Sequence, residues 1–278
     1  MVARRVRTAA RSGREAREDL PDAEDLAGLR AAVESVHWYH SIDLGNGIVT
    51  PGDSKTTPYG APVLPEMHGR TVLDIGAFDG YYSFAAERAG ASRVVALDHY
   101  MWGVDIDRRN GYWYRCNERD VIPDRRRDDA DFWDPSLPRR RPFDLAHHAL
   151  RSRVEPVVMD FMAGRLDRLG AFDVVLFLGV LYHLTDPIGA LERLRMVTRG
   201  VAVIETEALT VAGHESDLLV RFIAGDELNG DHTNWNQVTE PALHALCRVA
   251  GFGRVETVVG PPESGGEDGY RIVVHAFV

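Results

Sequence analysis

The chain has 278 residues, 45% of them apolar, with a formal net charge of −10 and two cysteines. This length can bury a full core, which favours one catalytic domain with an appended N-terminal segment over two domains. No apolar run reaches the length of a membrane span or follows the N-terminal arginines as a signal peptide would, and the acidic balance argues against a broad nucleic-acid surface. We therefore expect a cytoplasmic protein with reduced cysteines, a small-molecule partner and neither membrane nor nucleic acid; a homo-oligomer stays open.

The first part of the chain precedes any clear strand. Residues 1–20 carry six arginines and no apolar face, which predicts a frayed or disordered arm. Pro21 and Asp22 open a predicted helix with apolar residues at helical spacing. Glycine, proline and aromatic residues then mix up to Pro65, as in an ordered loop that leads into a site. We predict an N-terminal unit over 1–65 (arm, helix and site-covering loop) and a catalytic domain over 66–278.

The next segment predicts half of a nucleotide-cofactor fold. A buried strand over 71–75 runs into a glycine turn and a helix, and a second strand over 93–98 ends in a carboxylate. A dinucleotide site would need Gly-x-Gly-x-x-Gly to approach a pyrophosphate. Here Phe78 occupies the middle glycine position, and we expect Asp79 to face the ligand and repel phosphate. A ligand with a ribose and positive charge fits this turn better.

The remainder of the chain alternates helices with strands. Two irregular inserts are predicted at about 100–142 and 207–238, and the arginine runs of the first stand beside aspartates, as in a solvated loop. The predicted strands are 154–160, 172–178, 200–205, 254–259 and 270–277; the predicted helices are 143–150, one capped by Asp186, and 240–250, stopped by Gly251. This order predicts an α/β, Rossmann-like, doubly wound sheet of seven mostly parallel strands with one antiparallel strand, and inserts that form a lid.

Ligands of such sheets lie outside the carboxyl ends of the strands. Asp98 ends the second strand about twenty residues after the glycine turn, where a carboxylate accepts ribose hydroxyls; the alternative is a helix cap or a surface acid. His99 follows and either stacks near the ribose or is an ordinary loop residue. Asp74, Asp160 and Gly179 also stand at or just past strand ends.

Two motifs carry a resemblance to a known family. Asp74-Ile-Gly76-Ala-Phe-Asp-Gly80 resembles the first motif of class I S-adenosylmethionine-dependent methyltransferases and departs from it at Phe78. Gly179-Val-Leu-Tyr-His183 is similar to the group that contains the tRNA wobble-uridine carboxymethyltransferase and related small-molecule methyltransferases. The resemblance implies S-adenosylmethionine as cofactor, with Asp160 and Phe161 at its adenine; a strand-end cap and a core phenylalanine are the alternative. The implied cofactor-binding residues are Asp74, Gly76, Phe78, Gly80, Asp98, His99, Asp160, Phe161 and Gly179.

Methyl transfer needs a positioned nucleophile, and a base where that nucleophile carries a proton. We expect His183 as that base and Tyr182 beside the transferring group; alternatively His183 bonds the helix start at Asp186. Aromatic loop residues can cover an organic acceptor, and a cation near the last strand can meet a charged group. The candidate substrate residues are Tyr39, His40, Trp235 and Arg271. Acids of the second insert have no fixed spacing for Mg²⁺, so we expect no metal.

The leading hypothesis is methyl transfer to O or N of a small organic acceptor, with a biosynthetic intermediate of a natural product as one candidate. The alternatives are a tRNA-modifying methyl- or carboxymethyltransferase, and a cofactor-binding scaffold without chemistry. A carboxylated cofactor would need cationic partners, of which Arg271 is one. The resembled carboxymethyltransferases also use a lysine upstream of the glycine turn, and residues 36–42 contain none. This favours plain S-adenosylmethionine.

Overall fold

The structure is a computed structural model that describes residues 20–22, 24–52, 63–124, 127, 131–134, 137–263 and 269–278. All but the last residue of the predicted N-terminal arm, and parts of the predicted loop and first insert, lie outside the described residues. No helix among the described residues is long and apolar enough to cross a bilayer.

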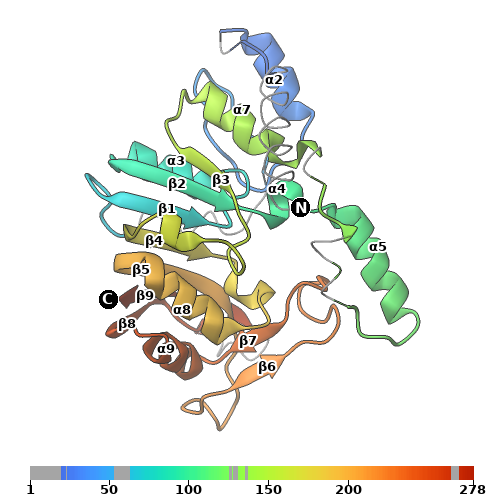
Figure 1. The fold of residues 1–278 in the computed structure, drawn as a ribbon, viewed down its shortest axis with the longest axis vertical. Helices are drawn as coiled ribbons and strands as arrows, with labels where there is room; N and C mark the ends of the chain where they lie inside the picture. Colours follow the sequence, from blue (N-terminus) through green and yellow to red (C-terminus); the bar gives the residue numbers. More distant parts are fainter. Residues whose placement is uncertain are drawn as a thin grey trace.

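The described residues form one nine-stranded sheet (Figure 1). Its strands are β1 (Thr71–Ile75), β2 (Arg93–Asp98), β3 (Glu155–Val158), β4 (Phe172–Leu178), β5 (Thr198–Ala208), β6 (Val220–Phe222), β7 (Asn236–Val238), β8 (Arg254–Val259) and β9 (Tyr270–Phe277). Parallel strands run in the order β3-β2-β1-β4-β5, and β9 pairs antiparallel with both β5 and β8. The seven predicted strands and the one antiparallel strand are confirmed. The other two, β6 and β7, form a ribbon that joins the end of β5.

Helices cover both faces of the sheet, because its central strands are apolar on both sides. The helices are α2 (Leu26–Glu34), α3 (Tyr81–Arg88), α4 (Tyr100–Gly103), α5 (Ile106–Asn117), α7 (Arg141–Ala149), α8 (Pro187–Val197) and α9 (Glu240–Val249), with 3-10 turns η2 (Pro138–Arg140), η3 (Leu166–Arg168) and η4 (Leu181–His183). Val72 and Val174 belong to one core cluster with α2, α3 and α7. Leu73 and Phe177 belong to the other, with α8 and α9. The sheet is therefore doubly wound, as predicted.

Local signals place several helix ends. Asp186 caps α8 as predicted, because its Oδ1 accepts a hydrogen bond of 2.9 Å from Gly189 N. Gly251 follows α9 at a φ of +98°, a left-handed conformation that suits glycine. The first helix begins later than predicted, at Leu26, because Asp25 rather than Asp22 accepts the capping bond from Gly28 N.

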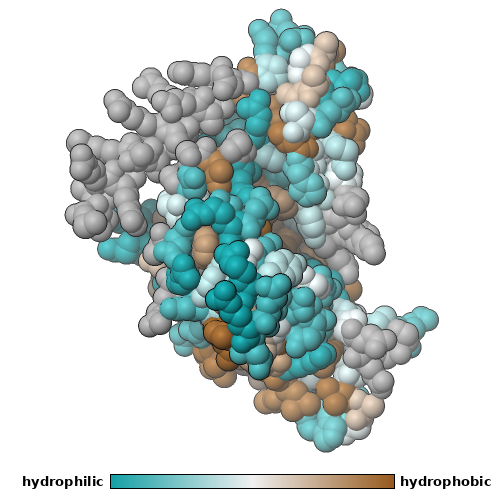
Figure 2. Space-filling view, turned by 90° about the vertical axis from the view of Figure 1, so that its right-hand side faces the viewer, coloured by the Kyte–Doolittle hydropathy of each residue, from teal (hydrophilic) through white to brown (hydrophobic). Residues whose placement is uncertain are grey.

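The two inserts contain regular structure that the sequence analysis missed. The first holds α5, whose buried positions are Arg109, Trp113 and Cys116. An arginine on the buried face hides the apolar period of this helix. The second insert holds the β6–β7 ribbon, and the inserts meet where the rings of Trp113 and Trp235 lie 5.2 Å apart. Figure 1 shows α5 projecting to the right of the sheet. Figure 2 faces that side, which is mostly hydrophilic with apolar residues gathered toward its lower edge.

Candidate active site

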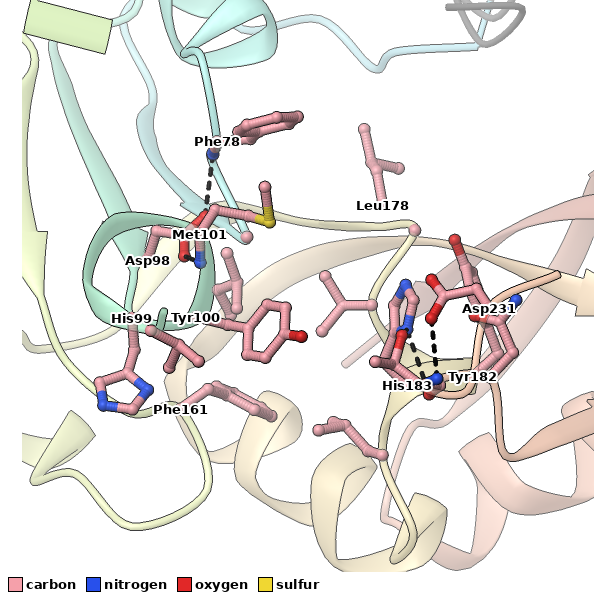
Figure 3. A pocket seen from close by; sticks show the side chains of 18 of the residues that line it. Phe78, Asp98, His99, Tyr100, Met101, Phe161, Leu178, Tyr182, His183 and Asp231 are labelled. Carbon is pink, nitrogen blue, oxygen red and sulfur yellow. Dashed lines mark hydrogen bonds between the residues drawn. The ribbon is translucent and has the colours of Figure 1, made fainter. Parts of the chain in front are cut away.

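A cavity of about 1500 Å³ opens at the carboxyl ends of β1, β2, β4 and β5. It is lined by strand-end residues and by residues of both inserts, including Asn110 and Tyr114 of α5 and the segment 228–234. Figure 3 shows Phe78, Met101 and Asp98 on one side and Tyr182, His183 and Asp231 on the other. Pockets for one drug-sized ligand measure roughly 300–1,000 Å³. This cavity therefore has room for a cofactor and an acceptor together.

The glycine turn lines the cavity through Gly76 and Phe78. Gly76 has a φ of +79°, and a Cβ there would lie 2.6 Å from Val180 Cγ2, so only glycine fits. Phe78 itself has a φ of +49°, which is strained for a residue with a side chain. Two hydrogen bonds hold it: Phe78 N donates to Asp98 Oδ2 over 2.9 Å, and Trp102 Nε1 donates to Phe78 O over 2.7 Å. The turn thus keeps its shape without the middle glycine of the motif.

Two buried carboxyl groups lie beside this turn. Asp98 accepts from Met101 N through Oδ1 over 2.9 Å, in addition to the bond from Phe78 N. Asp74 accepts from Ser83 Oγ over 2.6 Å. Burial raises the pKa of each carboxyl group to about 6. The backbone N–H of His99 also acts on the Asp98 carboxylate, and a carboxylate has about four acceptor sites, so acceptor capacity remains for a donor in the cavity.

Asp79 does not face the cavity, so the expectation that it meets the ligand is wrong. It is 0% exposed and accepts hydrogen bonds from Tyr39 N (3.1 Å) and His40 N (2.7 Å). His40 Nδ1 lies 2.7 Å from the other oxygen of Asp79, within hydrogen-bond distance. Asp79 therefore fastens the N-terminal loop to the glycine turn, and the Tyr39 ring packs 5.5 Å from that of Phe78. Tyr39 and His40 both line the cavity, but His40 is held by Asp79.

The other predicted cofactor residues differ in their positions. Asp160 and Phe161 line the cavity, and Asp160 also caps its own turn by accepting from Met162 N over 2.7 Å. His99 lines the cavity with its ring stacked 4.5 Å from Trp133. Gly80 is not among the lining residues. It starts α3 at a φ of +87°, where a Cβ would meet the Phe84 ring, so its role is in packing.

His183 stands on the opposite wall, in η4 just past β4. Its Nδ1 lies 3.2 Å from Thr233 O and 2.7 Å from Thr233 Oγ1. The carbonyl oxygen only accepts and so fits a proton on Nδ1, whereas the hydroxyl, which both donates and accepts, fits either tautomer; with the proton on Nδ1, a lone pair stays on Nε2. Burial lowers the pKa of His183 to about 4, against the opposing charge of Asp231. The alternative bond to the helix start does not form, since Asp186 caps α8.

Tyr182 belongs to a charged cluster around Arg271. Arg271 Nη2 donates to Tyr182 OH over 2.9 Å, Nη1 to Glu205 Oε1 over 3.0 Å, and Nε pairs with Glu207 Oε1 over 2.9 Å. Burial raises the pKa of the Tyr182 phenol, so Tyr182 stays neutral and does not act as a base. Gly179 lies next to this cluster, and the space of its missing side chain borders Glu205 and Tyr182.

Some residues that the sequence places in the site lie elsewhere in the structure. Trp235 is buried against Trp113 and is not among the described residues that line the cavity, so it is not a pocket wall as predicted. The described residues contain no group of three or more side chains arranged to hold a metal ion. Sequence reasoning missed Arg109 and Glu207, which both line the cavity. Glu207 could have been found from the sequence, because it stands two residues after Glu205, the acid that ends the predicted strand 200–205. In a strand, side chains two residues apart lie on the same face.

The sheet order, the glycine turn and the carboxylate that ends β2 define a class I S-adenosylmethionine-dependent methyltransferase. The chain matches the family described as Methyltransferase domain over residues 55–257 and belongs to that family. The cofactor of this class is S-adenosylmethionine, as the resemblance implied.

Similar proteins agree with this assignment. The chain is 29% identical over 200 residues to the tRNA U34 carboxymethyltransferase of Pseudomonas putida (strain W619), covering 71% of this chain and 50% of the relative. It is 26% identical over 198 residues to the enzyme of that name from Idiomarina loihiensis, with coverage of 71% and 50%. The chain thus spans about half the length of these curated relatives. The N-terminal domain of EvdMO1, crystallised with SAH and D-fucose, has the same fold, with a TM-score of 0.59, 19% identity, and coverage of 93% of this chain and 98% of that domain.

Proposed function

We propose that the protein transfers the methyl group of S-adenosylmethionine to an oxygen or nitrogen of a small organic acceptor. The observation that carries the proposal is the pairing, across one large cavity, of a buried Asp98 beside the glycine turn with a neutral His183 on the opposite wall. The first suits the ribose of the donor, and the second suits proton removal from an acceptor.

The residues around the glycine turn fit this cofactor. The Asp98 carboxylate would accept the ribose hydroxyls, and Gly76 would let the backbone approach the ligand, because a side chain there is excluded by Val180. Phe161, which lines the cavity, would cover the adenine, and Asp160 would accept from its amino group. When bound, S-adenosylmethionine supplies an electrophilic methyl group, whose bonding electrons stay with sulfur as the acceptor forms the new bond.

His183 supports the chemistry at the acceptor. Its lone pair on Nε2 can take the proton of an acceptor hydroxyl or ammonium as the new bond to carbon forms. Because its pKa is lowered to about 4, the imidazole is neutral throughout the neutral range, and it is a weaker base than a free histidine. The backbone of Thr233 fixes the ring orientation. The rival of a scaffold without chemistry is disfavoured, since both His183 and Tyr182 line the cavity.

Methyl transfer is favoured over transfer of a carboxymethyl group, the activity after which the relatives are named. A carboxylated donor needs a cationic partner; Arg271 is bound by two carboxylates, Glu205 and Glu207, which leaves Arg109 and Arg139 as the other arginines among the described residues that line the cavity. The net charge of −10 also argues against a tRNA substrate.

Titration calorimetry tests the donor site. We expect S-adenosylmethionine and S-adenosylhomocysteine to bind in the micromolar range, and NAD to give no heat. Binding of NAD in preference to both would refute the proposal. Mass spectrometry after incubation with methyl-labelled donor and an acceptor library then detects the transfer; carboxymethyl products with a carboxylated donor, and no methyl products with the plain donor, would also overturn it.

A further inference from the structure

We infer that the acceptor is a polyol, held through neighbouring hydroxyl groups by the carboxylates of Glu205 and Glu207. This inference deepens the proposed function and depends on it. Both side chains line the cavity and are nearly closed to bulk water, with exposures of 4% and 6%.

The side-chain partners of both carboxylates gather on their Oε1 atoms. Arg271 bonds Oε1 of Glu205 and Oε1 of Glu207, and Asn229 Nδ2 adds a bond of 3.0 Å to the same Glu207 oxygen. Among the described residues, Glu207 Oε2 has no hydrogen-bond partner and is not sealed off as a buried, unpaired atom, whereas the Glu205 carboxylate also meets the backbone N–H of Gly179. In side chains this buried, the remaining opening is the cavity. Buried carboxylate oxygens without donors are rare, which points to donors on a ligand.

The Glu205 carboxylate lies close to Tyr182, whose ring is next to that of His183, the proposed base. A Cβ on Gly179 would lie 3.6 Å from Glu205 Oε2 and 3.6 Å from Tyr182 OH, so this oxygen borders the open space above the end of β4. The rings of Tyr182 and His183 are neighbours, with centroids 4.2 Å apart. A molecule with one hydroxyl at His183 Nε2 can therefore extend along Tyr182 and present its adjacent hydroxyls to the two carboxylates.

Charge selects among acceptors that could donate hydrogen bonds here. Two carboxylates share one guanidinium, so an acidic group placed against them would be repelled; near His183 the charge of Asp231 is opposed by those of Arg271 and Arg109. An amine between these carboxylates would be held as ammonium, which has no lone pair to attack a methyl group. Hydroxyl groups donate to carboxylates while the one at His183 remains a nucleophile. Burial also raises the pKa of Glu205, and hydroxyl donors would stabilise its charged form.

The test compares probes on the intact chain with bound S-adenosylhomocysteine. Saturation-transfer NMR would follow methyl β-D-glucopyranoside and myo-inositol as polyols, and phenol and benzylamine as acceptors with a single functional group. We expect the polyols to bind at millimolar concentration, and the single-function probes to bind much more weakly. No binding of either polyol, or stronger binding of phenol or benzylamine, would overturn the inference.

A pair of variants locates the contact. Glu207→Gln should weaken polyol binding about tenfold, as expected for a lost hydrogen bond to a charged group, while leaving affinity for S-adenosylhomocysteine within about twofold. Glu192→Gln, on the exposed surface of α8, is the matched control and should change neither. Unchanged polyol binding in a folded Glu207→Gln protein would refute the contact. Failure of the donor itself to bind would instead refute the proposed function, so the two outcomes are distinct.

Discussion

The donor site makes its strongest prediction at Asp98. Asp98→Asn removes the carboxylate that we propose accepts the ribose hydroxyls, and hydrogen bonds to charged groups contribute roughly 1.5–3 kcal/mol. The affinity for S-adenosylhomocysteine should therefore fall about 10- to 150-fold at pH 7.5. The amide must also turn its NH₂ group toward Phe78 N or Met101 N, two donors that the carboxylate accepts. We expect this mismatch to lower the free energy of unfolding by about 1–3 kcal/mol.

The Asp98 carboxyl group also makes the affinity for S-adenosylhomocysteine depend on pH. The pKa of Asp98 is raised to about 6 by burial, and binding of ribose hydroxyls favours the ionised form. Affinity is thus complete above this pKa and falls as the pH drops through it, about tenfold between pH 7 and pH 5. Titration calorimetry at several pH values measures the loss of affinity in Asp98→Asn and the pH dependence of the parent, with Glu192→Gln as control. A variant that binds within threefold of the parent, or keeps the full pH slope, would refute the reasoning.

Three further substitutions test the rest of the site. His183→Ala should lower turnover about 10²- to 10⁴-fold with donor affinity unchanged; because the pKa of His183 is lowered to about 4, the parent rate should show no inflection near pH 6.5, and one there would contradict the assignment. Asp79→Ala leaves its histidine partner and two backbone N–H groups unpaired. Chemical denaturation should therefore show that the free energy of unfolding falls by about 3–5 kcal/mol. A fall of under about 1 kcal/mol would contradict the view that Asp79 fastens the N-terminal loop to the glycine turn. Gly76→Ala should abolish donor binding, because the new methyl group would contact Val180. The control Gly170→Ala has a similar φ of +84°, but open space surrounds its new methyl group, so this variant should bind the donor normally. If both variants lost donor binding equally, backbone strain alone would be responsible.

Local patterns in the sequence were sufficient for much of the fold. The apolar strands, the glycine turn and the carboxylate that ends β2 depend on residues close together along the chain, and all lie where predicted. The helix α5 was missed because its buried face includes Arg109, which breaks the apolar period. Trp235 was misplaced because an aromatic residue in a loop gives no sign of which segment it packs on, and here that segment is α5.

Side-chain direction was decided only by the tertiary structure. The sequence by itself determined the class of cofactor, since the turn and the strand-end acid are short-range features. It could not determine that Asp79 turns away from the cavity, because its partners lie about forty residues earlier in the chain. Nor could it bring Arg271 against Glu205 and Glu207, a contact that the antiparallel pairing of β9 with β5 creates. The proposed donor site therefore depends mostly on local sequence, whereas the charge and shape of the proposed acceptor site come from long-range packing.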